Sequence, residues 1–91
     1  MTGRVIHKEV INTTAPITIK TNRAAFKFLS CAEQLENVSL WYETLSDEKF
    51  RTDTLQLMLI GTGFQVPNDL EYYGTVALEC GLVWHIYGAW M

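Results

Sequence analysis

Short runs of alternating apolar and polar residues, separated by turn residues, cover most of the chain. Residues 5–11 are rich in β-branched side chains, and Ile17 and Ile19 fall on one face if residues 17–20 are extended. The segment between these runs, 12–16, holds asparagine and proline, which favour turns. The pattern therefore predicts two β-strands joined by a turn.

Further strands are predicted along the rest of the chain, at 38–45, 54–62, 73–80 and 82–87. Gly81 can adopt the positive φ that suits a tight hairpin between the last two strands. Residues 66–70 have turn composition. Residues 46–53 form the most polar stretch, and we expect a solvated hairpin loop there.

The strand expected at 54–62 is apolar on both faces, with leucines on one side and Met58 and Ile60 on the other. Strands of this kind are usually central and covered twice. The second cover is either the domain's own second layer or a partner subunit, and the sequence leaves both open.

Residues 24–36 fit two structures. Alanine, phenylalanine and leucine recur there at helical spacing, but residues 26–31 also read as a strand followed by a turn at 35–37. We favour the strand, because its neighbours are strands and an antiparallel meander is the simplest topology, while a short helix near 24–36 stays open. The chain is therefore predicted to be all-β. We expect a single domain over 1–91, a small antiparallel β-sandwich or partly open barrel of about six to seven short strands.

The formal charge of −3 argues against a nucleic-acid partner, because such proteins neutralise phosphates with cations. The charge is unevenly distributed. Residues 1–30 carry five cations and one acid (net +4), and residues 31–91 carry two cations and nine acids (net −7). Either strands from the two halves pair, so that the charges offset within one molecule, or a basic face of one subunit meets an acidic face of the next.

No apolar run approaches the roughly 20 residues that span a bilayer, and no apolar signal region follows the N-terminus. We therefore expect a cytoplasmic protein with no membrane partner. Cys31 and Cys80 are expected to be reduced thiols that serve as small core residues.

Candidate chemistry is sparse. Gly61-Thr62-Gly63 invites a phosphate-loop interpretation, but no helical pattern follows it, so we expect a corner where the chain leaves the sheet, with a backbone-amide ligand contact as the alternative. His7 and His85 have no cysteine or histidine at metal-ligand spacing, and the carboxylates cluster in predicted loops and turns. We therefore predict no catalytic residue, metal or cofactor, and we favour a hydrogen-bonded structural role for His85.

Aromatic side chains have the strongest claim to function. Adjacent pairs such as Trp41-Tyr42 and Tyr72-Tyr73 point to opposite faces of a strand, so one ring of each pair should lie outside the core or in a second buried layer. Such rings suit an oligomer interface or a binding surface, and partial exposure without function is the alternative. Together with arginines of the basic N-terminal third, the candidate binding residues are Trp41, Tyr42, Phe64, Tyr72, Tyr73, Trp84, His85, Trp90, Arg4 and Arg23.

Four motifs, I-H-K near the start, G-T-G-F-Q-V-P and Y-G-T-V in the middle and V-W-H-I near the end, resemble a family of small proteins encoded mainly by bacteriophages and prophage-bearing bacteria. The family is catalogued as a domain of unknown function. The chain departs from its pattern at 31–34 and lacks a turn glycine near Asn37. The resemblance implies a phage origin and an all-β fold, and it carries over no catalytic residues.

We therefore expect a non-enzymatic, phage-type accessory binding protein, which forms a homo-oligomer. It would inhibit a host defence factor or sequester a nucleotide signal, so that its partner is a host protein or a small anionic ligand. The alternative is a structural or assembly component of a phage particle.

Overall fold

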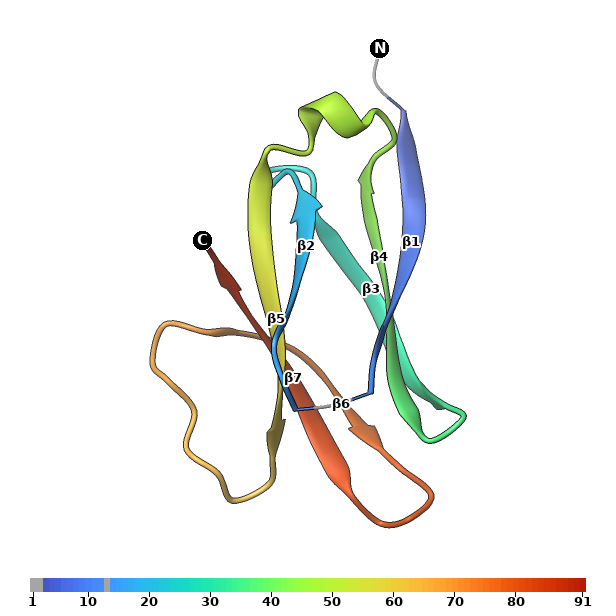
Figure 1. Cartoon of the computed structure of the whole chain (residues 1–91), viewed down its shortest axis with the longest axis vertical. Helices are drawn as coiled ribbons and strands as arrows, with labels where there is room; N and C mark the ends of the chain where they lie inside the picture. The colour runs from blue at the N-terminus through green and yellow to red at the C-terminus, as the bar shows by residue number, and fades with distance from the viewer. Residues whose placement is uncertain (1–2, 13) are drawn as a thin grey trace.

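The computed structural model describes residues 3–12 and 14–91, and it confirms the predicted all-β class (Figure 1). The predicted turn over 12–16 includes Thr13, which lies outside the described residues. One turn of 3-10 helix, η1 (Glu48–Phe50), is the helical element of the described chain. The strands are β1 (Arg4–Ile11), β2 (Ile17–Thr21), β3 (Lys27–Gln34), β4 (Asn37–Leu45), β5 (Asp53–Gly61), β6 (Glu71–Ala77) and β7 (Val83–Trp90).

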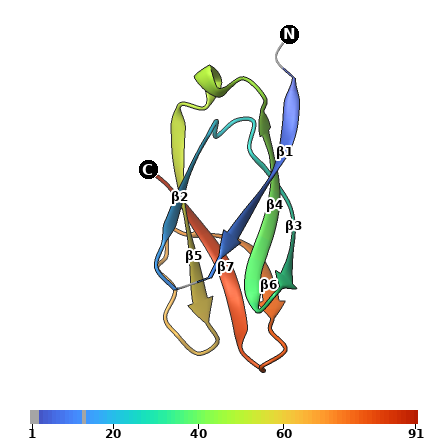
Figure 2. The same cartoon turned by 45° about the vertical axis from the view of Figure 1, so that its right-hand side comes forward.

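The strands form two antiparallel sheets that face each other as a sandwich. The three-stranded sheet has the order β1-β4-β3, and the four-stranded sheet has the order β2-β5-β7-β6. Along one side β3 packs against β6, and Figure 2 shows these two strands next to each other. The expected meander is wrong, because the chain changes sheet after β1, β2 and β4. Each change of sheet places the apolar face of one strand opposite the apolar face of a strand in the other sheet. The alternation of residues within one strand does not show which sheet that strand joins.

The expected hairpin loop at 46–53 is also wrong in its connectivity. The segment crosses from β4 in one sheet to β5 in the other, and η1 lies within it. The carboxylate of Asp47 accepts a hydrogen bond from the Lys49 amide at 3.1 Å and so caps η1. The polar composition therefore marked a surface connection correctly but did not show which strands it joins.

Residues 27–34 form strand β3, so the strand interpretation of the ambiguous segment is confirmed. Its register shifts between Phe28 and Ser30, where β3 carries a bulge. The bulge lets Phe28 and Cys31, which are three residues apart, both pack against the core. The inward residues of β3 are therefore spaced by three around the bulge, and strict alternation is lost there.

The core lies between the two sheets. Leu55 and Leu57 of β5 are fully buried there, together with Leu40 of β4 and Ile86 of β7. The opposite face of β5 carries Met58 and Ile60, which pair across strands with Tyr87 and His85 and are half-buried. The described chain has two layers, so the second cover predicted for β5 is not found within it.

The two cysteines differ in environment. Cys31 packs against the core, and burial raises the pKa of its thiol above the ordinary value. The core position expected for Cys80 is wrong: its side chain is exposed, because β6 ends at Ala77 and leaves Cys80 in the turn before β7. No helix within the described residues is long and apolar enough to cross a membrane.

Candidate functional site

Four chain connections meet at one end of the sandwich, at the bottom of Figure 1. They join β1 to β2, β3 to β4, β5 to β6 and β6 to β7. We call this region the loop end and define it by residues 12, 14–16, 35–36, 62–70 and 78–82. Loops gathered at one end of a sandwich are common positions for binding surfaces, because the sheets hold them rigidly.

A cavity of about 280 Å³ opens between the two sheets at the loop end. Its polar lining comes from Asn12, Thr14, Glu36 and Cys80. Most of its lining is hydrocarbon or aromatic, contributed by Ile11, Val38, Leu59, Leu78, Leu82 and Trp84. The cavity is therefore shaped for an apolar group.

Trp84 is the central side chain of this region, since it lines the cavity and two shallower hollows beside it. Its neighbour across the strands is Gly61, and the ring of Phe64 lies over that glycine. A Cβ atom at Gly61 would lie 3.1 Å from the Phe64 ring and 3.5 Å from the Trp84 ring. Glycine at position 61 therefore allows both rings to approach the end of β5.

The predicted corner at Gly61-Thr62-Gly63 is confirmed. β5 ends at Gly61, a turn follows, and Gly63 has a φ of 92°, which favours glycine. The turn closes with a hydrogen bond from the Phe64 amide to the Gly61 carbonyl at 3.2 Å. The motif thus brings Phe64 back over the sheet end.

Large apolar side chains of the loop end face solvent. The exposed fractions are 93% for Leu35, 75% for Phe64 and 55% for Leu82. Each of these side chains comes from a different connection of the loop end. Apolar side chains gathered in this way mark interaction surfaces.

Leu35 is held in a strained backbone conformation. Gln34 pairs with Asn37, so Leu35 and Glu36 are the two central residues of a tight hairpin, with φ values of 52° and 66°. A two-residue turn with positive φ at both positions favours Asn-Gly, because other side chains are strained there. The chain thus presents a leucine in a turn where a polar residue and a glycine would fold more easily.

A second group of predicted binding residues lies in or against the core, away from the loop end, with Arg23 exposed at its edge. The ring of Phe26 contacts Tyr42, Tyr73 and Trp90, with ring centres 5.5–5.7 Å apart, and Arg23 lies over the Trp90 ring at 5.6 Å. Tyr42 is 4% exposed, and its ring therefore fills the core and offers no binding surface. Burial, with the Glu9 carboxylate as a smaller cause, raises the pKa of Tyr42 to about 12.

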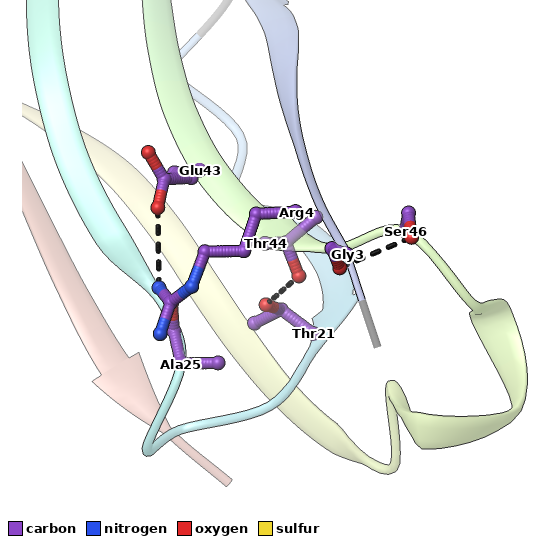
Figure 3. Close-up of polar contacts among 7 residues, drawn as sticks. All are labelled: Gly3, Arg4, Thr21, Ala25, Glu43, Thr44 and Ser46. Carbon is purple, nitrogen blue, oxygen red and sulfur yellow. Dashed lines mark hydrogen bonds and ion pairs between the residues drawn. The ribbon is translucent and has the colours of Figure 1, made fainter. Parts of the chain in front are cut away.

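Trp41 and Arg4 lie on the outer face of the three-stranded sheet. The Lys8 ammonium lies 5.8 Å from the centre of the Trp41 ring, a cation–π contact. Arg4 donates to Glu43 at 3.1 Å and to the Ala25 carbonyl at 3.2 Å (Figure 3). The Arg4–Glu43 ion pair joins the basic and acidic parts of the sequence within one molecule.

His85 lies on the face of β7 opposite to Trp84, in a chain of hydrogen bonds. Its Nε2 lies 2.9 Å from Thr62 Oγ1, and its Nδ1 lies 2.9 Å from Thr75 Oγ1. The Tyr72 hydroxyl is 2.5 Å from Thr75 Oγ1 and extends the chain. Because hydroxyl groups both donate and accept, either tautomer of the imidazole is satisfied, and the contacts fix the ring on the sheet.

The structure therefore divides the predicted site residues into four groups and brings Phe64 and Trp84 together at the loop end. Sequence reasoning missed Leu35, Glu36 and Leu82, which belong to the same surface. Leu35-Glu36 left one signal, since a leucine at the first position of the turn predicted at 35–37 contradicts turn preferences. Leu82 left none, because a leucine at the start of a predicted strand is ordinary.

The fold and the apolar loop end define a class, a small β-sandwich with a candidate binding surface formed by its connections. A family model described as a domain of unknown function, DUF7352, matches residues 2–90. The chain therefore belongs to the DUF7352 family. Comparisons with curated proteins and with solved structures give no significant match.

Proposed function

We propose that this protein is a non-enzymatic binding module that contacts another protein through its loop end. The observation that carries the proposal is the apolar cavity around Trp84 with Leu35, Phe64 and Leu82 exposed beside it. Apolar anchors of a partner gain free energy when such a cavity removes them from water. The side chains gathered there are suited to burial and not to proton or group transfer.

The target we favour is a protein and not a nucleotide. A nucleotide phosphate needs cations or a helix N-terminus, as in known phosphate sites. The loop-end segments contain no lysine or arginine in their sequence. The likeness of the chain to a phage and prophage family supports an accessory role in the host cytoplasm, in which the target is a host factor, for example one of defence.

The protein is also proposed to form a homo-oligomer through the outer face of the four-stranded sheet. Met58 and Tyr87 are cross-strand neighbours on that face, and Ile60 lies beside them on β5. Burial of this face would give β5 the second cover that its sequence predicts. Light scattering of the purified protein tests this part. A monomer at low micromolar concentration would contradict it, and Met58→Glu should dissociate an oligomer that forms.

The binding function is tested by covalent capture in bacterial cells. The tagged protein is crosslinked in vivo, and its neighbours are identified by mass spectrometry. The matched control is the double variant Leu35→Asn/Glu36→Gly, which changes the loop end and keeps the hairpin. A partner captured by the natural chain and lost in the variant would support the proposal.

Three outcomes would contradict the proposed function. Capture of the same partners by both chains would separate binding from the loop end. A thermal shift with cyclic or ADP-ribose-type nucleotides would make the target a small molecule. Abundant copies in purified phage particles would indicate a structural component.

A further inference from the structure

The electrostatic character of the loop end differs from that of the rest of the protein. Three glutamates lie at or beside it: Glu36 and Glu79 in two connections and Glu33 near the end of β3. The seven lysines and arginines lie in other segments, at Arg4, Lys8, Lys20, Arg23, Lys27, Lys49 and Arg51. The loop end therefore carries acidic side chains beside the apolar cavity. Its own connections contain no cationic residue.

One of the three carboxylates lines the cavity, and Glu79 lies between two lining residues, Leu78 and Cys80. Glu36 lines the cavity directly. Glu33 accepts a hydrogen bond from the Glu79 backbone amide at 2.7 Å, which ties the β6–β7 turn to β3. Within the described part of the chain, none of these three carboxylates forms an ion pair. Their charge is thus available to a group that docks at the cavity.

We propose that the segment bound at the loop end is basic: an apolar side chain that enters the cavity, flanked by lysine or arginine residues that meet Glu36 and Glu79. This inference rests on the proposed function and adds the chemistry of the partner. The apolar lining selects a hydrocarbon or aromatic anchor, and the acidic rim selects its flanks. An acidic segment with the same anchor would be rejected by like-charge repulsion.

The strained turn supports the same assignment. Leu35 and Glu36 supply an exposed apolar group and a carboxylate from adjacent positions, in a conformation that both side chains disfavour. Strain of this kind persists where a site requires particular side chains. An Asn-Gly turn would relieve the strain but would remove both the apolar contact and the charge.

The test uses the full chain and synthetic peptides that share one apolar centre, a leucine or a phenylalanine, and differ in their flanks. One set has lysine flanks, one serine and one glutamate. Affinity is measured by fluorescence anisotropy at low and at high salt, and the indole signal of Trp84 in NMR spectra reports binding at the cavity. We expect lysine-flanked peptides to bind at least about tenfold more tightly than glutamate-flanked ones at low salt, and the difference to shrink at high salt.

Two charge-removing variants locate the effect. Glu36→Gln/Glu79→Gln should abolish most of the preference for lysine flanks and leave the binding of serine-flanked peptides unchanged. The matched control, Asp47→Asn/Glu48→Gln, removes two carboxylates beside η1 and should change neither affinity. The variant Leu35→Asn/Glu36→Gly should weaken all peptides, because it removes an apolar contact as well.

The outcomes separate this inference from the proposed function. If serine-flanked peptides shift the Trp84 signal but the charge of the flanks has no effect, the partner is not basic and the binding function stands. If no peptide shifts that signal and crosslinking captures the same proteins with the turn variant, both proposals fail. If Glu36→Gln/Glu79→Gln changes the oligomeric state of the protein, the loop end is occupied by a second copy of the chain. The inference that it binds a basic segment of another protein is then wrong.

Discussion

At the end that carries η1, polar side chains join the two sheets, whereas at the loop end the sheets separate around an apolar cavity. Thr21 of β2 and Thr44 of β4 share a buried hydrogen bond of 2.6 Å between the sheets (Figure 3). Ser46 donates to the Gly3 carbonyl from both its amide and its hydroxyl, at 2.9 and 3.0 Å. A buried hydrogen bond thus connects the two sheets at one end, where Ser46 also ties the end of β4 to the start of β1 within one sheet, and exposed apolar groups remain at the other end.

The interior follows the same division. The half of the core nearer to η1 is filled by the ring cluster around Phe26, while the loop end contains the cavity beside Trp84. If the proposed function holds, stability and binding are assigned to different ends of one sandwich. We then expect the fold to depend little on the exposed side chains of the loop end.

The largest difference in stability is expected when a phenylalanine is replaced by alanine at each of the two ends. Phe26→Ala should lower the free energy of unfolding by about 3 kcal/mol, because it empties the centre of the ring cluster. Phe64→Ala, at a ring that is 75% exposed, should change it by no more than about 0.5 kcal/mol. Urea denaturation of both variants measures the difference. Equal losses would show that the loop end carries as much of the stability as the ring cluster.

High pH should destabilise the ring cluster. Burial raises the pKa of Tyr42 to about 12 and raises the pKa of Tyr73 as well, so the unfolded chain releases these protons first. Stability should therefore be unaffected below pH 10 and fall above it, by up to about 1.4 kcal/mol per pH unit for each tyrosine. Denaturation between pH 8 and about 11 measures the slope, and Tyr42→Phe should reduce it. A flat profile would mean that the Tyr42 hydroxyl is not buried.

The polar connection between the sheets is tested by a double-mutant cycle. Thr44→Val should cost about 2 kcal/mol, because it leaves the buried Thr21 hydroxyl without its partner. The double variant Thr21→Val/Thr44→Val should be close to the natural chain, since both polar groups are then replaced by methyl groups. If the double variant loses as much as the two single variants together, the threonines contribute through packing and not through their hydrogen bond.

At the strained turn we expect a small effect that, unlike the substitutions above, increases stability. Leu35→Asn/Glu36→Gly should raise the free energy of unfolding by about 1 kcal/mol, because Asn-Gly adopts positive φ with little strain. Thermal unfolding measures the gain. A lower melting temperature would show that Leu35 packs against the free protein, and the loop end would then be a structural region.

Sequence patterns predicted the strands well, because alternation reports which face of each strand is buried. The adjacent pair Trp41-Tyr42 has one ring outside and one in the core, as expected. The same patterns did not predict which sheet a strand joins, so they could not separate Trp84 from Tyr42 as a site residue. A bulge in β3 also gave its inward residues a helix-like spacing.

The sequence by itself determined the all-β class, the inward and outward faces of the strands, and the turns at Gly63 and Gly81, since these depend on neighbouring residues. The tertiary structure alone decided that Phe64 and Leu82 gather around Trp84, that Glu36 lines the same cavity as Trp84, and that Glu79 is held against Glu33. These residues are far apart along the chain and come together because three connections cross between the sheets. Such crossings are set by how the two apolar faces cover each other, and no local pattern encodes them.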